Sequence, residues 1–452
     1  PTIKLPNKHF DTLLYTGNSS TNAITGLNYQ PDWVWIKRRS GANAHQLYDA
    51  VRGAGKVLKS DSTNAEADET AFNSFDSNGF EVDGGSNSHN ASGETYVAWN
   101  WNAGDTDSKT YTVKVVSDSG NKYRFDDFGT SAVTLDLAEG GTYIFDQSDS
   151  SNAGHPLRFS TTADGTHGGG TEYTTGVTTA GTPGSSGAYT QIVVAASAPN
   201  LAYYCTNHSG MGGSVNTNST LGSSNFDGTI QTTVKVNATA GFSIVTYTGT
   251  GSDGTLGHGL GVAPSIYIVK RRNSTKDWYV QIGNLSGIDL GRFLKLNTND
   301  GLNFASDVFA ASADTSTVLN TKSDSATNAS GDTYVAYVFS EVAGYSKFGS
   351  YTGNGNANGT FVPLSFRPAW FVVKRTNASN NWRTFDAKRS TFNEVDKRLY
   401  LDTSGAESTG SDIDFLSNGV KMRMTDSGMN ASGGEYIYLA FAEAPFRNAR
   451  AR

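Results

Sequence analysis

One short stretch holds the only cysteine of the chain together with two other side chains of metal-binding type. Within YYCTNHSGMGG, Cys205 is followed by His208 three positions later and by Met211 three positions after that. Thiolate, imidazole and thioether groups are soft ligands of the kind that hold copper. The stretch therefore leaves two alternatives: a soft metal is bound here, or the fold keeps the residues of a metal site that has been lost.

The residues around this stretch predict a small β-sandwich. YTVKVV and KYRF flank the turn SDSGN, AVTLDL alternates, TYIFDQ follows a Gly-Gly pair, and QIVVAA and LAYYC complete the set of strands. The last strand carries Cys205 into a tight loop, and an NAGHPL segment supplies His155 upstream. His167, in the Gly-rich loop DGTHGGGTEY, is expected to be exposed. These residues, 106–216, are predicted to form one domain.

This domain resembles the cupredoxins, the blue-copper electron carriers. The resemblance implies a Greek-key sandwich with His155 as the upstream imidazole, Cys205 as the thiolate, His208 as the second imidazole and Met211 as the weak axial thioether of a copper site. The spacing matches the short ligand loop of amicyanins, but Asn207 stands where a proline is common. The alternative is a cupredoxin-like scaffold without metal, in which the cysteine is a small buried hydrophobe and the histidines make hydrogen bonds.

The rest of the chain repeats itself, which indicates copies of one module. Three blocks recur in the same order and at nearly the same spacing. Their copies are YTGN, YTGT and YTGN at Tyr15, Tyr247 and Tyr351; QPDWVWIKRR, APSIYIVKRR and RPAWFVVKRT from Gln30, Ala263 and Arg367; and NASGETYVAWNW, NASGDTYVAYVF and NASGGEYIYLAF from Asn90, Asn328 and Asn430. We therefore expect four tandem antiparallel β-sandwich domains in an all-β chain. Their predicted limits are 1–105, 106–216, 240–344 and 345–452, with a linker over 217–239 and a basic C-terminal tail.

Each repeated block has a physical interpretation. Pro, an apolar run and then Lys-Arg predict a buried strand whose basic end is solvated and discourages edge pairing; a ligand-binding stripe is the alternative. Asn-Ala-Ser-Gly is typical of a turn, because Asn and Ser bond to neighbouring backbone. It also fits a glycosylation sequon, but turn chemistry explains it better. The two SNG segments, at Asn78 and Asn418, predict hairpins.

Composition excludes several classes of function. The net charge of −7, from 35 basic and 42 acidic residues, gives no support for nucleic-acid binding. A single cysteine leaves no disulfide framework, and no long apolar run predicts a membrane span. The first residues show no secretory signal, which indicates synthesis in the host cytoplasm. No hydrolase, zinc-protease or complete phosphate-loop motif occurs, so we expect no enzyme and assign no catalytic residue.

The repeated blocks, with the ending YLAFAEAPF, resemble modules of tail-fibre and other virion structural proteins of marine tailed bacteriophages. The resemblance is close in the first and third copies and looser in the second, where ASDVFAASADTSTV replaces the hairpin. It implies lectin-like sandwiches, a place on the virion surface, and a symmetric homo-oligomer with other virion proteins as partners. Tail-fibre or receptor-binding adhesion to a host-surface glycan is the favoured role. The alternatives are a capsid-decorating or tail-assembly protein, and a copper redox module.

Overall fold

The chain folds almost entirely into β-strands. The computed structural model describes residues 3–104 and 108–444. Strands make up 42% of the described residues and helices 2%, so the all-β prediction is confirmed. The helical turns in the described residues are η1 (Pro6–Lys8), η2 (Ser150–Asn152) and η3 (Gly165–Gly168). No helix in this described part has the length and apolar composition needed to cross a membrane.

The three sequence repeats share one sheet topology. In each, the strand that begins the repeat pairs with the strand after the NASG turn. That strand pairs with the apolar strand that ends in Lys-Arg, which we call the KR strand, and the KR strand pairs with a fourth strand. These orders are β1 (Phe10–Thr16), β9 (Thr95–Trp101), β3 (Trp33–Arg38), β4 (Gln46–Asp49); β22 (Phe242–Thr248), β29 (Thr333–Phe339), β24 (Ile266–Arg271), β25 (Trp278–Gln281); and β30 (Ser346–Thr352), β37 (Glu435–Ala442), β32 (Pro368–Arg375), β33 (Arg383–Asp386). Equal order in all three supports triplication of one module.

Further strands complete each repeat. The first repeat adds β2 (Asn22–Thr25), β8 (Gly79–Val82), β7 (Phe72–Asp76), β5 (Lys56–Val57) and β6 (Ala67–Asp68). The second adds β26 (Arg292–Lys295), β27 (Asn303–Phe304), β23 (Gly254–Gly257) and β28 (Val318–Thr321), and the third adds β34 (Val395–Tyr400), β35 (Ser408–Leu416), β36 (Gly419–Met422) and β31 (Phe361–Pro363). Both SNG segments form the predicted hairpins, because Asp76 pairs with Gly79 and Leu416 with Gly419.

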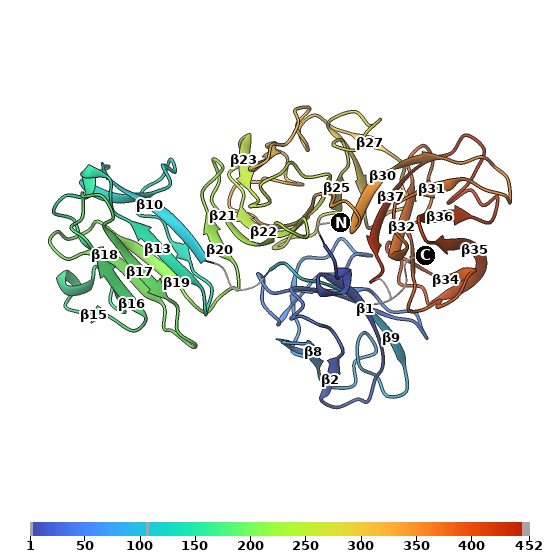
Figure 1. Cartoon of the computed structure of the whole chain (residues 1–452), viewed down its shortest axis with the longest axis horizontal. Helices are drawn as coiled ribbons and strands as arrows, with labels where there is room; N and C mark the ends of the chain where they lie inside the picture. Colours follow the sequence, from blue (N-terminus) through green and yellow to red (C-terminus); the bar gives the residue numbers. More distant parts are fainter. Residues whose placement is uncertain (1–2, 105–107, 445–452) are drawn as a thin grey trace.

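Between the first two repeats lies an insert domain, β10 to β19, made of two five-stranded sheets around a core of its own. One sheet runs β11 (Asn121–Phe125), β10 (Ser108–Ser117), β13 (Thr142–Asp146), β17 (Tyr189–Val193), β16 (Val177–Ala180). The other runs β12 (Leu135–Asp136), β19 (Gly213–Asn216), β18 (Leu201–Cys205), β14 (Leu157–Ser160), β15 (Glu172–Tyr173). Figure 1 shows this domain to one side of the three repeats.

The predicted linker contains strands that fasten the insert domain to the second repeat. Within 217–239, β20 (Ser223–Asn225) and β21 (Thr232–Asn237) extend the sheet of the second repeat beyond β22. The Tyr111 hydroxyl of the insert domain donates to the Ser224 carbonyl at 2.8 Å, and Phe226 packs into the insert core. This segment is therefore a structural part of both units.

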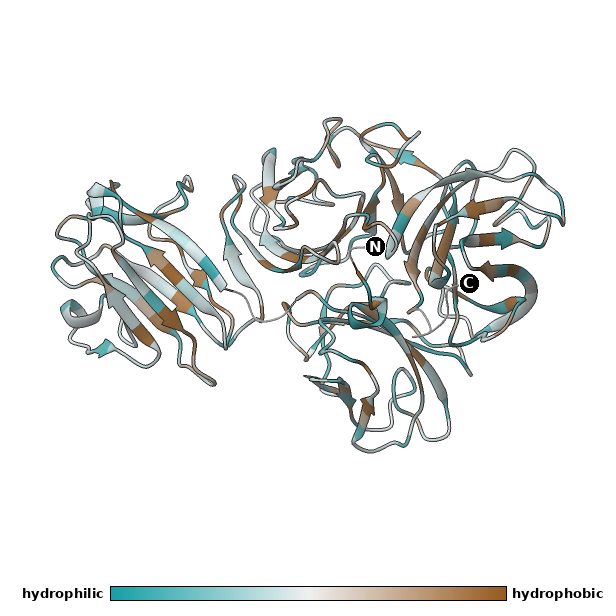
Figure 2. Cartoon of the chain, viewed as in Figure 1, coloured by the Kyte–Doolittle hydropathy of each residue, from teal (hydrophilic) through white to brown (hydrophobic). Residues whose placement is uncertain are grey.

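The three repeats pack around one shared hydrophobic core. One cluster of buried residues joins Trp33 and Trp101 of the first repeat, Tyr337 of the second, and Trp370 and Phe441 of the third. The rings of Trp33 and Tyr337 stack with their centroids 4.2 Å apart. The rings of Trp101 and Trp370 pack edge to face with their centroids 5.5 Å apart. Each repeat also has a separate outer core, so its main sheet is buried on both faces. Figure 2 shows the hydrophobic residues concentrated on the strands.

The contacts between repeats close a ring with approximate threefold symmetry. At each of the three interfaces a backbone amide of one repeat donates to the carbonyl at the end of the neighbour's KR strand. These bonds are Glu66 to Arg272 at 2.7 Å, Glu407 to Arg39 at 2.9 Å and Leu302 to Thr376 at 2.7 Å. We refer to the three packed repeats as the repeat ring.

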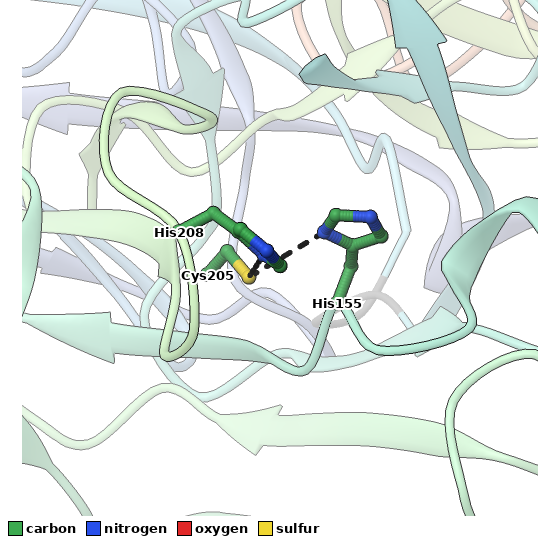
Figure 3. A group of neighbouring side chains, drawn as sticks. All are labelled: His155, Cys205 and His208. Atoms are coloured by element: carbon green, nitrogen blue, oxygen red, sulfur yellow. Dashed lines mark hydrogen bonds between the residues drawn. The ribbon is translucent and has the colours of Figure 1, made fainter.

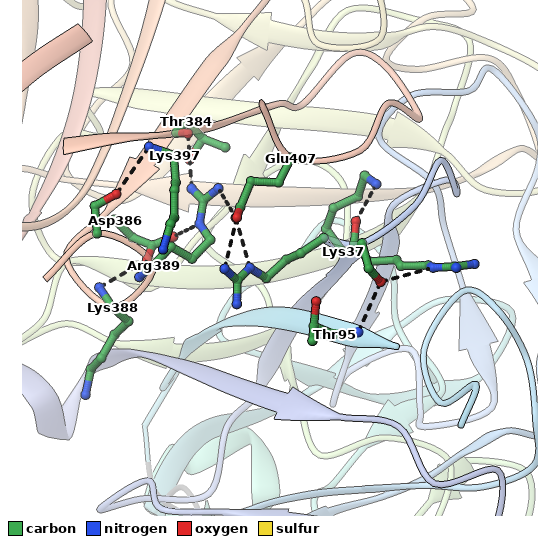
Figure 4. Close-up of polar contacts among 12 residues, drawn as sticks. Lys37, Thr95, Thr384, Asp386, Lys388, Arg389, Lys397 and Glu407 are labelled. Atoms are coloured by element: carbon green, nitrogen blue, oxygen red, sulfur yellow. Dashed lines mark hydrogen bonds and ion pairs between the residues drawn. The ribbon is translucent and has the colours of Figure 1, made fainter. Parts of the chain in front are cut away.

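The prediction that the Lys-Arg-Arg ends are solvated is wrong. Lys37, Lys270 and Lys374 are fully buried, and burial lowers the pKa of each to about 8. Arg39 donates two bonds of 2.9 Å to Glu407 of the third repeat, and Arg272 donates bonds of 3.0 and 2.9 Å to Glu66 of the first. Figure 4 shows Glu407 with guanidinium groups on two sides. The basic strand ends are thus contacts between repeats.

The NASG turns clamp the YTG loops. Asn90, Asn328 and Asn430 are buried, and each accepts a hydrogen bond from the backbone of its YTG loop. A side chain on Gly17 would lie 2.2 Å from the Ala91 carbonyl oxygen, so only glycine allows this approach. The buried asparagines agree with the turn interpretation and are not accessible for glycosylation.

Candidate metal centre

The sheet of the insert domain brings two distant ligand segments to one edge. Strand β18 is buried throughout and ends at Cys205. Its partner β14 pairs in a register that sets Leu157 opposite Cys205. Because His155 precedes Leu157 by two residues, it lies at the same end of the sheet. The loop after β18 then returns His208 to this point.

Three of the four predicted ligands meet. The Sγ atom of Cys205 lies 3.8 Å from Nδ1 of His155 and 3.7 Å from Nδ1 of His208. All three ligand atoms are within 4.8 Å of one another. A metal with ligand distances of 2.0–2.3 Å in a trigonal array separates sulfur from nitrogen by ~3.7 Å. Figure 3 shows both imidazoles turned toward the sulfur. The spacing therefore fits one ion bound between them.

Met211, the fourth predicted ligand, follows His208 in the same loop. It is 1% exposed and belongs to the same hydrophobic cluster as Cys205. Together with His208 it lines an open pocket of about 480 Å³ at the surface of the domain. The loop can return here because Gly212 passes against β18, where a Cβ would lie 1.7 Å from the Tyr203 carbonyl oxygen.

Hydrogen bonds tie the two ligand loops to each other and to the domain. Asn207, at the position where a proline is common, donates from Nδ2 to the Gly154 carbonyl at 2.9 Å. The His155 carbonyl accepts from Nε2 of Gln147 at 2.8 Å and from the Tyr123 hydroxyl at 2.9 Å. Such contacts from outside the ligand group orient metal ligands, and the spacing of the ligands in the sequence does not predict them.

The ligands differ in their access to solvent. Cys205 is buried, His155 is half-buried and His208 is exposed. Burial, and then the nearby charge of His208, lowers the pKa of His155, which favours the neutral imidazole that binds metal. A site of this kind is shielded on its sulfur side and reachable through one histidine edge.

His167 lies next to the site but outside the ligand group. It is exposed, as expected, and its Nε2 is 3.1 Å from the backbone oxygen of Cys205. It also lines the open pocket beside His208. Sequence spacing gave no indication of this contact, because η3 brings the residue to the loop from a separate segment.

Comparison with known proteins places most of the chain in one family. A model for a domain of unknown function, DUF7483, matches residues 5–124 and 207–445. No curated protein and no solved structure matches the chain. The unmatched residues 125–206 include His155 and Cys205, whereas His208 and Met211 fall in the matched part. Because the match covers well over half of its length, the chain belongs to the DUF7483 family.

Proposed function

We propose that the insert domain binds one copper ion through His155, Cys205 and His208, with Met211 as a weak axial ligand. The observation that carries this proposal is the pair of sulfur–nitrogen distances, 3.8 and 3.7 Å, both to Nδ1 atoms. One thiolate and two imidazoles in a trigonal set are characteristic of copper sites that carry electrons. The cupredoxin resemblance of this domain supports the same assignment.

The experiment is a copper titration of the purified protein. With Cys205 reduced, copper(II) is expected to produce the intense visible band of thiolate-to-copper charge transfer. The Cys205→Ser variant, which keeps the shape of the site, should lack the band. If the wild-type protein shows no band despite a reduced thiol, the insert domain is a scaffold in which Cys205 is only a small buried side chain.

For the whole chain we propose a non-enzymatic structural role on the surface of a bacteriophage particle. The resemblance of the repeats to virion proteins supports this role and favours tail-fibre or receptor-binding adhesion, with a host-surface glycan as the target. The repeat ring is consistent with this role. Its main sheets are buried in the hydrophobic cores, so the loops are left to contact other molecules. Phe392, in one such loop, is 82% exposed.

The rival is a capsid-decorating or tail-assembly protein that binds only other virion subunits. Gold-labelled antibody on intact particles tests the shared part of both proposals; a location inside the capsid, or absence from the particle, would defeat them. Purified protein added before infection separates them. An adhesion protein is expected to compete with particles for host cells, whereas a decorating protein leaves adsorption unchanged.

A further inference from the structure

Tyr123 contacts both loops that carry the candidate ligands. It lies on β11, and its hydroxyl donates to the carbonyl of His155 at 2.9 Å. Its backbone amide donates to the carbonyl of Met211 at 3.0 Å. One residue on a strand of the opposite sheet therefore holds the upstream histidine and the axial methionine at once.

Tyr123 is itself rigidly held. The side chain is buried, and its ring lies 6.3 Å from that of Tyr203 on β18. The Tyr123 carbonyl accepts a bond of 2.8 Å from the Ala132 amide. A side chain anchored in this way has few alternative rotamers, so its hydroxyl keeps a fixed position relative to the ligand loops.

The Tyr123 hydroxyl is shielded from water. Burial raises the pKa of Tyr123, so the hydroxyl stays protonated and can donate to the His155 carbonyl. Tyr123 thus contacts the backbone of both segments that carry the candidate ligands.

We propose that Tyr123 is a positioning residue of the metal centre. It fixes the spacing of the ligand loops before copper binds. This proposal rests on copper binding by the insert domain. Asn207 joins the same loops at the surface, whereas Tyr123 joins them from the core, where water cannot replace its hydroxyl.

The test compares Tyr123→Phe with Tyr111→Phe. Tyr111 is equally buried, and its hydroxyl also donates to one carbonyl, that of Ser224, at 2.8 Å, away from the ligand loops. Loss of an outer contact typically weakens metal binding 10–100-fold. We expect Tyr123→Phe to bind copper(II) at least about tenfold more weakly, with a shifted charge-transfer band. Tyr111→Phe should match the wild type in both.

A second measurement does not depend on the folding of Tyr123→Phe. 3-Fluorotyrosine, which retains the hydroxyl, is introduced at position 123 or at position 111, and the fluorine resonance is recorded with and without copper(I). A shift at position 123 and none at position 111 is expected. Equal responses, or a Tyr123→Phe variant with wild-type band and affinity, would overturn the proposal. A wild-type protein that binds no copper would instead defeat the proposed function.

Discussion

The hydroxyl of Tyr337, in the second repeat, donates a hydrogen bond of 2.7 Å to Oδ2 of Asp49 in the first. At the next interface of the repeat ring the same position is Trp99, whose indole donates to Asp386 of the third repeat at 3.1 Å. Each acid is also paired with a buried arginine three residues later in its own repeat. Two interfaces therefore join a polar aromatic side chain to a buried ion pair.

The third interface uses different chemistry. The residues at the corresponding positions are Leu439 and Gln281, which cannot form this contact. Both the acid and its aromatic donor are absent at these two positions, so no buried charge is left unpaired there. The interface keeps its backbone bond from Leu302 to Thr376 and a bond of 2.9 Å from the Trp382 indole to the Lys295 carbonyl.

Tyr337→Phe should destabilise the protein by about 1.5–3 kcal/mol, because Asp49 loses a charge-assisted hydrogen bond in a buried site. Tyr345→Phe is the matched control. Its hydroxyl is buried in the same shared core and has no hydrogen-bond partner among the described residues. That change should be neutral or slightly stabilising. Chemical denaturation measures both, and equal effects would contradict the role of the Asp49 contact.

Arg389→Met should cost ~3–5 kcal/mol, since it leaves Asp386 buried without its cation. The control is Arg292→Met. Arg292 pairs with Asp289 at 3.7 Å on the surface, and its loss should change the free energy of unfolding by less than about 1 kcal/mol. Comparable losses in the two variants, measured by urea titration, would argue against a dominant buried pair.

His45 should make the repeat ring sensitive to acid. Its Nδ1 accepts from the Trp35 indole at 2.8 Å, and its Nε2 lies 2.9 Å from the Tyr400 carbonyl of the third repeat. Burial, and then the charge of Lys37, lowers the pKa of His45 to about 3. As the pH falls below 6.5, His45 is therefore protonated in the unfolded chain but stays neutral in the folded protein.

Stability from this group is complete above the unfolded pKa of 6.5 and is lost toward pH 3. The loss is about 1.4 kcal/mol for each pH unit. His45→Gln can keep the donor to Tyr400 but has no such titration. Its urea midpoint should change less than that of the wild type between about pH 7 and about pH 4. Parallel pH profiles would show that His45 is not the responsible group.

His155→Ala should abolish the charge-transfer band or weaken it strongly, because the trigonal set loses one nitrogen. His167→Ala provides the comparison. It removes a neighbouring imidazole whose contact is to the Cys205 backbone, outside the three-residue ligand group. Copper titration of both should separate ligand from neighbour. A band that survives without His155 would exclude the proposed ligand set.

The repeats and their strands could be predicted because local patterns specify them. Five successive residues of WVWIKR are buried, and such a run is typical of a strand covered on both faces. The shared core cannot be predicted in the same way, because the apolar run does not say what covers the second face. The Lys-Arg-Arg ends were misinterpreted for a related reason. Their partners Glu66 and Glu407 lie in segments that do not belong to the repeated blocks.

At the candidate site, the sequence indicates the candidate ligands but not the residues that hold them in place. Ligand type and spacing pointed to His155, Cys205 and His208 without any contact information. Tyr123 and Gln147 carry no such pattern, because a hydrogen bond to a backbone carbonyl can come from any donor that the fold brings near. Only the packing of the two sheets places them there.

The first repeat cannot complete its packing during translation until the third repeat has been made, because the two share one core. The ring centroids of Phe10 and Phe441 lie 5.1 Å apart, so a side chain of β1 must wait for one that is made about 430 residues later. At ~5–20 residues per second, the inner face of the first repeat stays uncovered on the nascent chain for tens of seconds. During translation its tryptophans therefore stay exposed to solvent, and a chain that stops before β37 leaves Phe10 without Phe441, one of its three aromatic neighbours.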